Sequence, residues 1–183
     1  KAKVKANKAF IKIRKCETLV FFMNLTPCRS MILNDLTKEY QVFLFDFDGL
    51  LADTEHVHFE AFKELLKRWK YDLDWQFRDY VNAAHFSTTG LKDTILKKFP
   101  DLEEKVGPWK EWYSKKNAIY IELLGKGVQL LPGAKELLDH LKEANIKRAV
   151  VTHSPKNLVD IIKAQHECLQ SIPNWYTREL YTK

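Results

Sequence analysis

Cysteine is scarce in this chain of 183 residues, which contains Cys16, Cys28 and Cys168 and no Cys-x-x-Cys pair. An odd number of widely spaced thiols excludes a disulfide framework and a cysteine-based zinc site. Reduced thiols of this kind are typical of proteins in a reducing compartment. We therefore expect a cytoplasmic protein.

Long hydrophobic runs are also missing, because no stretch of about eighteen consecutive apolar residues occurs. No membrane-spanning helix and no membrane partner are therefore expected. Internal repeats and low-complexity tracts are absent too, and 45% of the residues are hydrophobic. These features predict one ordinary globular domain, or one core with a small insert.

The excess of positive charge is confined to one end of the chain. The formal net charge is +6, but residues 1–22 contain seven of the 30 basic residues and one of the 24 acidic residues. The rest of the chain is therefore neutral. A nucleic-acid partner would rest on this end alone, and we do not expect one.

Residues 1–30 are interpreted as a basic and irregular extension. The chain does not begin with methionine, and its first methionines are Met23 and Met31. A translated upstream extension explains this segment. A targeting segment is the alternative, because a basic stretch precedes the apolar residues 19–25. Whether residues 1–22 belong to the natural protein stays open.

One stretch carries the chemistry of the chain, residues 42–55, with the sequence VFLFDFDGLLADTE. Its first four residues form a continuous apolar run, as in a strand that is buried on both faces. Asp46 and Asp48 follow this strand, and Gly49 follows them. Open parallel sheets bind ligands at the carboxyl ends of their strands, so two carboxylates there predict a magnesium-assisted site. Two solvated acids in a β-turn are the plain alternative.

The pattern D-x-D-G-x-L-x-D-T-E after a hydrophobic strand resembles motif I of the haloacid dehalogenase superfamily, in its branch of phosphatases and β-phosphoglucomutase-like enzymes. The resemblance implies that Asp46 is the nucleophile that attacks a phosphoryl group. It implies that Asp48 is the general acid and base, and that Asp46 and Asp48 bind Mg²⁺, Asp48 through its backbone carbonyl. An acid at the second position favours phosphoryl transfer, because the true dehalogenases of the superfamily lack it.

The spacing of apolar and helix-breaking residues in the rest of the chain predicts an α/β order. Strands are expected at residues 42–45, 146–151 and 175–177. Helices are expected at residues 55–70, 73–84, 91–98, 101–124 and 156–168, and from Pro132-Gly133 to a left-handed stop at Asn145. Asp53 or Thr54 is expected to cap the helix that follows the two acids. Right-handed crossovers in a parallel sheet follow from this order.

The resemblance implies the fold in more detail. Residues 31–55 and 131–183 would form an incomplete Rossmann-like core with a parallel sheet, and residues 56–130 an inserted, all-helical cap. Motif II, a Thr or Ser at the end of the next strand, falls on Thr152 in AVVTHSP. Thr152 would hold the phosphoryl group together with nearby backbone amides and Gly49. By itself, Thr152 fits equally well as the N-cap of the next helix.

Three further sets of residues are weaker candidates. Lys156 and Asn157 would help to hold phosphate or a sugar, or they begin a solvated helix. Lys92 and the loop of residues 88–90 would approach the distal end of a substrate, or Lys92 is an ordinary surface lysine. The remaining residues of interest are expected to be structural, namely Trp75, Trp109 and Trp112 in the cap core, and His56, His58 and His153, which lack partners at metal-ligand spacing.

Two family motifs are not found, the lysine of motif III and the acidic pair of motif IV. Lys183 is the one candidate for motif III, and whether the gene continues past it stays open. We expect weak or no activity and poor solubility of this piece alone.

The leading hypothesis is a Mg²⁺-dependent phosphomonoester hydrolase that acts through an aspartyl-phosphate on a small phosphorylated metabolite. A β-phosphoglucomutase-type phosphotransferase and an inactive remnant that binds phosphate or a partner are the alternatives. The substrate and the oligomeric state stay open.

Overall fold

The computed structural model describes residues 37–38 and 40–180. It divides the chain into two compact units. Unit 1 comprises Lys1–Ala52 and Gln129–Lys183, and unit 2 comprises Asp53–Val128. The predicted extension of residues 1–30 and the motif III candidate Lys183 lie outside the described residues.

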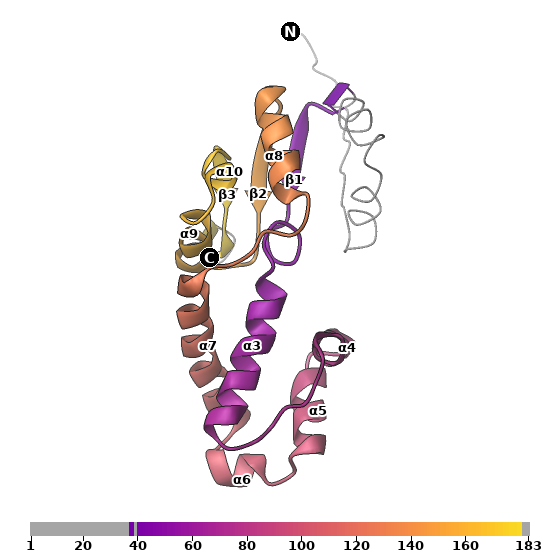
Figure 1. Ribbon diagram of the computed structural model, residues 1–183, viewed down its shortest axis with the longest axis vertical. Helices are drawn as coiled ribbons and strands as arrows, with labels where there is room; N and C mark the ends of the chain where they lie inside the picture. Colours follow the sequence, from indigo (N-terminus) through magenta and orange to yellow (C-terminus); the bar gives the residue numbers. More distant parts are fainter. Residues whose placement is uncertain (1–36, 39, 181–183) are drawn as a thin grey trace. The chain divides into compact units, whose positions relative to one another are not determined.

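Unit 1 contains a parallel sheet of three strands in the order β1-β2-β3 (Figure 1). The strands are β1 (Val42–Phe45), β2 (Lys147–Val151) and β3 (Asn174–Tyr176). Phe43 is in register with Arg148, and Val150 with Trp175. The α/β class with a parallel sheet is therefore confirmed. Strand β1 has its predicted range, β2 begins one residue later than predicted, and β3 is displaced by one residue.

The two faces of this sheet differ. Phe43, Phe45 and Val150 point to one face and are buried. On the opposite face, Val42 and Leu44 are 49% and 47% exposed. Val151 and its register partner Tyr176, also on this face, are 38% and 44% exposed. The strand predicted to be buried on both faces is thus buried on one face within the described part of the chain.

The helices of unit 1 are α8 (Ala134–Glu143), α9 (Lys156–Lys163) and α10 (Glu167–Gln170), followed by a short 3₁₀ helix, η1 (Arg178–Leu180). Helix α8 buries Ala134, Leu138 and Leu141 completely. Its C-terminal stop is Asn145, which has φ = 53°, as predicted.

The prediction of one helix at residues 156–168 is wrong, because α9 ends at Lys163 and α10 begins at Glu167. Continuation of α9 beyond the buried Ile162 would bring Gln165 and His166 to its inward face. The break instead allows Cys168 and Leu169 to be buried.

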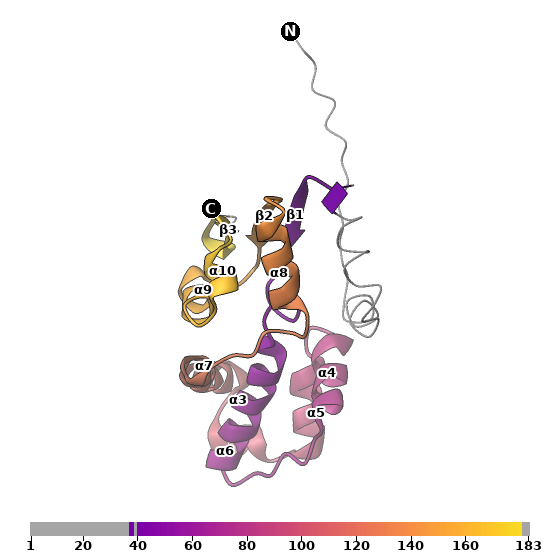
Figure 2. The same ribbon diagram turned by 45° about the horizontal axis from the view of Figure 1, so that its top comes forward.

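Unit 2 consists of helices in the part of the chain that the structure describes. They are α3 (Thr54–Arg68), α4 (Phe77–Phe86), α5 (Gly90–Lys98), α6 (Leu102–Val106) and α7 (Trp109–Lys126). Helices α3 and α7 lie side by side in both views (Figure 2) and form the most extensive helix pairing of the unit. The side chain of Asp53 caps α3 by accepting a hydrogen bond from the His56 amide, which settles the choice between Asp53 and Thr54.

Two predicted helices of unit 2 have different bounds. Residues 73–76 are not helical, because Gln76 is the N-cap of α4 and donates its amide to the Asp79 carboxylate at 2.9 Å. The helix predicted at 101–124 is two helices. Gly107, with φ = 92°, and Pro108 separate α6 from α7, since proline cannot donate a backbone hydrogen bond.

Among the described residues, none of the helices combines the length and the apolar character that a membrane span requires.

Candidate active site

The loop after β1 is a tight turn built around Phe47. The carbonyl of Phe47 accepts hydrogen bonds from the amides of Leu50, Leu51 and Ala52 at 3.0–3.3 Å. Gly49 has φ = 67°, a left-handed conformation that favours glycine, and it donates its amide to the carbonyl of Ala52 at 2.9 Å. The turn fixes the backbone on both sides of the second acid.

Phe47 also determines where the two acids point. Its side chain is fully buried and packs edge-on against Trp175 of β3, with 5.5 Å between ring centroids. Successive side chains of extended backbone point to opposite sides. The inward position of Phe47 therefore directs Asp46 and Asp48 away from the buried core, where Asp46 is exposed and Asp48 half-buried.

Asp48 is held by two hydroxyl groups from the loop after β2. The hydroxyls of Thr152 and Ser154 both donate to Asp48 Oδ2, at 3.1 Å and 2.6 Å. The Thr152 hydroxyl also accepts the Ser154 amide at 3.0 Å. Thr152 follows β2 and Asp48 follows β1, so their contact connects the ends of the two strands. This contact lies at the base of the site, because Thr152 is 3% exposed.

Asp46 has a different environment. Its Oδ1 accepts the amide of Phe47 at 2.7 Å. Although the residue is exposed as a whole, partial desolvation of its carboxyl group raises the pKa of Asp46 above the ordinary value. The Phe47 amide lowers this pKa, the negative charge of Asp48 raises it, and His153 lowers it. Two neighbouring acids of this kind favour a cation between them.

The donor set fits Mg²⁺. No group of three or more His, Cys, Asp or Glu side chains converges on one point among the residues that the structure describes. Mg²⁺ does not need such a group, because it commonly takes one or two carboxylates and completes its octahedron with water and substrate phosphate. The Asp46 carboxylate and the backbone carbonyl of Asp48 supply oxygen ligands of that kind.

Lys156 lies at the first position of α9. Its ammonium pairs with Asp160 one turn along the same helix, at 2.5 Å. Its backbone amide donates to both carboxylate oxygens of Glu179, at 3.0 Å and 3.1 Å. The recorded partners of Lys156 are therefore these two acids, whereas Thr152 is in direct contact with Asp48.

Sequence reasoning missed two residues of the site, Ser154 and Glu179. The loop after β3 holds the loop after β2, because Arg178 donates its amide to the Ser154 carbonyl at 3.2 Å and Glu179 caps α9. The short pattern Thr-x-Ser at residues 152–154 was the one available signal for Ser154. Nothing near Lys156 in the sequence indicates Glu179.

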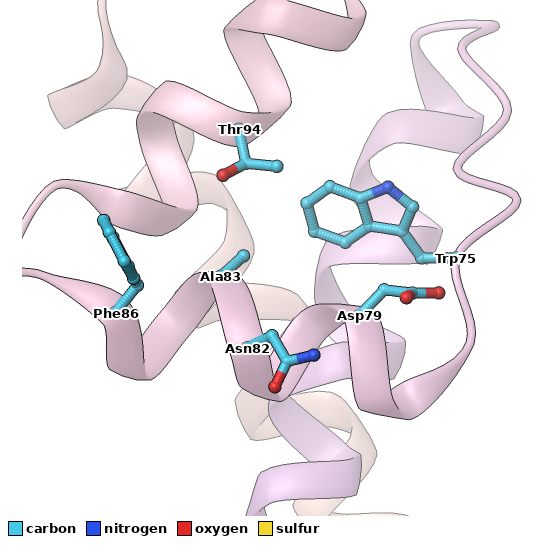
Figure 3. A pocket seen from close by; sticks show the side chains of 6 residues that line it. All are labelled: Trp75, Asp79, Asn82, Ala83, Phe86 and Thr94. Carbon is cyan, nitrogen blue, oxygen red and sulfur yellow. The ribbon is translucent and has the colours of Figure 1, made fainter.

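Unit 2 has an open pocket of its own, of about 510 Å³, between α4 and α5 (Figure 3). Figure 3 shows the Trp75 indole over the groove, with Asp79 and Asn82 on α4 and Thr94 on α5 around it. Phe86, 87% exposed, stands at the far end of α4. The prediction of a core position therefore holds for Trp112, which is 1% exposed, whereas Trp109 is half-buried and Trp75, also half-buried, lines this pocket.

Two other residues that the sequence singled out in unit 2, Lys92 and His58, contact side chains of the same unit. The Lys92 ammonium pairs with Glu103 at 3.1 Å. His58, expected to be a plain helix-start residue, instead contacts Lys116 through Nδ1 at 2.6 Å.

Comparisons with known proteins point to one family. The family model described as haloacid dehalogenase-like hydrolase matches residues 43–179. Protein CbbY of Rhodobacter capsulatus is 33% identical over 129 residues, which cover 69% of this chain and 56% of that protein. A probable pseudouridine-5'-phosphatase of Drosophila melanogaster is 29% identical over 142 residues, covering 77% of this chain and 58% of that protein.

Among solved structures, CbbY of Rhodobacter sphaeroides in complex with phosphate aligns with a TM-score of 0.53 and 22% identity. The alignment covers 78% of this chain and 65% of that one. A likeness at this identity supports the fold. The chain spans just over half the length of the two curated relatives.

Proposed function

The chain belongs to the haloacid dehalogenase-like hydrolase family, and we propose that its site transfers a phosphoryl group from a small phosphorylated metabolite to water. The observation that carries the proposal is the contact of Thr152 and Ser154 with Asp48, beside Asp46, at the ends of β1 and β2. Related proteins include a probable pseudouridine-5'-phosphatase and a phosphorylated carbohydrates phosphatase. These names suggest phosphate esters of small molecules as the substrate class.

Asp46 is the proposed nucleophile. One of its oxygens attacks phosphorus, a new O–P bond forms, and the bond from phosphorus to the substrate oxygen breaks. The attack requires an ionised carboxylate. The Phe47 amide, 2.7 Å from Oδ1, supports ionisation, whereas desolvation opposes it. Because the Phe47 amide donates to Oδ1, we assign Oδ2 of Asp46 as the attacking oxygen.

Asp48 is the proposed general acid and base. In the first step it gives a proton to the leaving alkoxide, and in the second it removes a proton from the water that attacks the aspartyl-phosphate. The second step releases inorganic phosphate and restores Asp46. Because two hydroxyls occupy Oδ2 of Asp48, Oδ1 is the oxygen that we assign to proton transfer.

Mg²⁺ is the proposed cofactor, held by Asp46 and Asp48. When bound, it would neutralise charge on the phosphoryl oxygens and favour the ionised form of Asp46. We further propose that Gly49, Thr152 and Lys156 contribute to phosphate binding. In this proposal, unit 2 is the cap and selects the substrate. The proposed location of the protein is the cytoplasm.

The test compares wild type with Asp46→Asn and Asp48→Asn. Each chain is incubated with a generic phosphomonoester and Mg²⁺, and released phosphate and the intact mass of the protein are measured. We expect wild type to release phosphate weakly, Asp46→Asn to lose that turnover and any covalently bound phosphoryl group, and Asp48→Asn to lose the turnover. Glu143→Gln, at the exposed end of α8, serves as the control. Phosphate release by Asp46→Asn at the wild-type rate would rule out the nucleophile.

The mutase alternative uses the same two acids and differs in the acceptor, a sugar phosphate instead of water. Isomerisation of a glucose phosphate without net phosphate release would favour it. Binding of inorganic phosphate and Mg²⁺ without either reaction would favour an inactive binding protein. Equilibrium dialysis with Mg²⁺ gives a readout that does not depend on turnover, and we expect Asp46→Asn to weaken Mg²⁺ binding.

A further inference from the structure

Lys116, in the middle of α7, is a buried charged group that the proposed chemistry does not use. It is 1% exposed and is the one buried lysine in the described part of the chain. A buried ammonium is unfavourable unless other groups compensate for lost hydration. Its surroundings therefore need an explanation.

The surroundings are aromatic and include one histidine. Lys116 Nζ lies 2.6 Å from Nδ1 of His58 on α3. The His58 ring is stacked on Tyr120, with 3.9 Å between centroids and 7° between planes. Three rings lie 5.0–5.2 Å from the ammonium, those of Phe62, Tyr113 and Tyr120. Because an ammonium has no acceptor, His58 accepts at Nδ1 and carries its own proton at Nε2.

Few charged groups face this pair. On α3, Glu55 acts on Lys116 through its negative charge, but its Oε1 lies 3.4 Å from His85 of α4. On α7, Asn117 accepts weakly from Lys116 at 3.5 Å. Tyr80 of α4 stays neutral, because burial raises the pKa of its hydroxyl well above the ordinary value of 10. No acid of the described residues forms an ion pair with Lys116.

We propose that Lys116 and His58 form a proton-dependent contact between α3 and α7, in which each proton that the pair binds weakens the packing of the two helices. With one proton, the pair keeps a positive charge in an apolar site. With two protons, it would hold two positive charges 2.6 Å apart. With none, the amine still donates to His58 and no charge is buried.

The direction of both pKa shifts agrees with this geometry. Burial lowers the pKa of Lys116 from 10.5 to about 8, although Glu55 acts in the opposite direction. Burial, and then the charge of Lys116, lowers the pKa of His58 from 6.5 to about 3. The unfolded chain therefore binds more protons than the folded chain between pH 8 and 10.5 and between pH 3 and 6.5. Stability rises with pH in both windows.

The first test is a titration of the full chain by nuclear magnetic resonance, with ¹³C-labelled lysine and histidine side chains. Lys116→Met identifies the Lys116 signal. We expect one lysine to titrate near pH 8 and His58 to stay neutral well below 6.5. Titration of Lys116 together with the exposed lysines would overturn the proposal. This readout needs no turnover, so it is independent of the proposed function.

The second test measures unfolding by tryptophan fluorescence in a Trp175→Phe background, where the remaining tryptophans belong to unit 2. Lys116→Met is compared with Lys115→Met, which changes the exposed neighbour on α7. We expect the difference in the free energy of unfolding between wild type and Lys116→Met to shift in favour of wild type as the pH increases above 8. The same difference between wild type and Lys115→Met should not change with pH. Equal pH dependence in both comparisons would contradict the proposal. His58→Gln keeps a hydrogen-bond acceptor for Lys116 and should remove the loss of stability that wild type shows as the pH falls below 6.5.

Discussion

Thr152→Val removes the hydroxyl that joins the loops after β1 and β2 but keeps the shape of the side chain. The hydroxyl donates to Asp48 Oδ2 at 3.1 Å and accepts the Ser154 amide at 3.0 Å. Since Thr152 is 3% exposed, water cannot easily replace it. The variant therefore leaves the Ser154 amide without its recorded acceptor and Asp48 with one hydroxyl donor instead of two.

The expected cost follows from these two contacts. A hydrogen bond to a charged group contributes about 1.5–3 kcal/mol, and a buried amide left unpaired costs about 1–3 kcal/mol. Ser154 is half-buried and keeps its own contact with Asp48, so the lower end of each range applies. The loss is about 2.5 kcal/mol in the free energy of unfolding of unit 1. For a chain of this size it lowers the melting temperature by about 5–10 °C.

Trp175 is the assay probe, because it is the one tryptophan of unit 1 and contacts Phe47. Urea unfolding is followed by its fluorescence in a background where the other tryptophans are phenylalanine. Thr152→Ser is the control, since it keeps the hydroxyl and loses one methyl group, at about 1 kcal/mol. If Thr152→Val were no less stable than Thr152→Ser, the hydroxyl would not connect the two loops and our reasoning would be refuted.

Two further predictions concern unit 1. Arg148→Met removes guanidinium hydrogen bonds to the carbonyls of Ile146 and Ser171. It should lower the free energy of unfolding, measured with urea, by about 2–4 kcal/mol. The control Lys147→Met, at an exposed position, should change this free energy by less than about 0.5 kcal/mol. The Thr177 hydroxyl, followed by backbone amides that include Lys156, lowers the pKa of Glu179. The ionised Glu179 carboxylate therefore stabilises the folded state above pH 4.5, the ordinary pKa of a glutamate. This stabilisation is lost as the pH falls through the lowered pKa of Glu179 in the folded chain. Glu179→Gln should remove this acid-dependent loss in a pH titration of circular dichroism, and an unchanged titration would count against the cap.

The family and the α/β class were predictable because their signals are local. The apolar run before Asp46 and the continuation after Gly49 specify a strand and a turn without reference to the rest of the chain. The helix bounds were less predictable where capping competes with apolar spacing, as at Gln76 and at Gly107-Pro108. There, one side-chain hydrogen bond or one missing amide outweighs periodicity.

The contacts of Ser154 and Lys116 were not predictable, because their partners are distant in sequence. Ser154 and Asp48 are 106 residues apart, and Lys116 and His58 are 58 residues apart. Each pair meets only after packing of two elements fixes its distance. Apolar spacing on α7 places Lys116 at a buried position without indicating that a histidine of α3 faces it. The roles of Asp46, Asp48 and Thr152 stay predictions until the variants are measured.

The exposed apolar face of the sheet has a consequence for handling the protein. Val42, Leu44, Val151 and Tyr176 line it, and Lys147 lies beside Val42 in the same register. A single positive charge of this kind acts as a gatekeeper that keeps such surfaces from associating with one another. Salt screens that charge and strengthens apolar contact. The concentration at which light scattering first detects aggregates should therefore fall as salt is added.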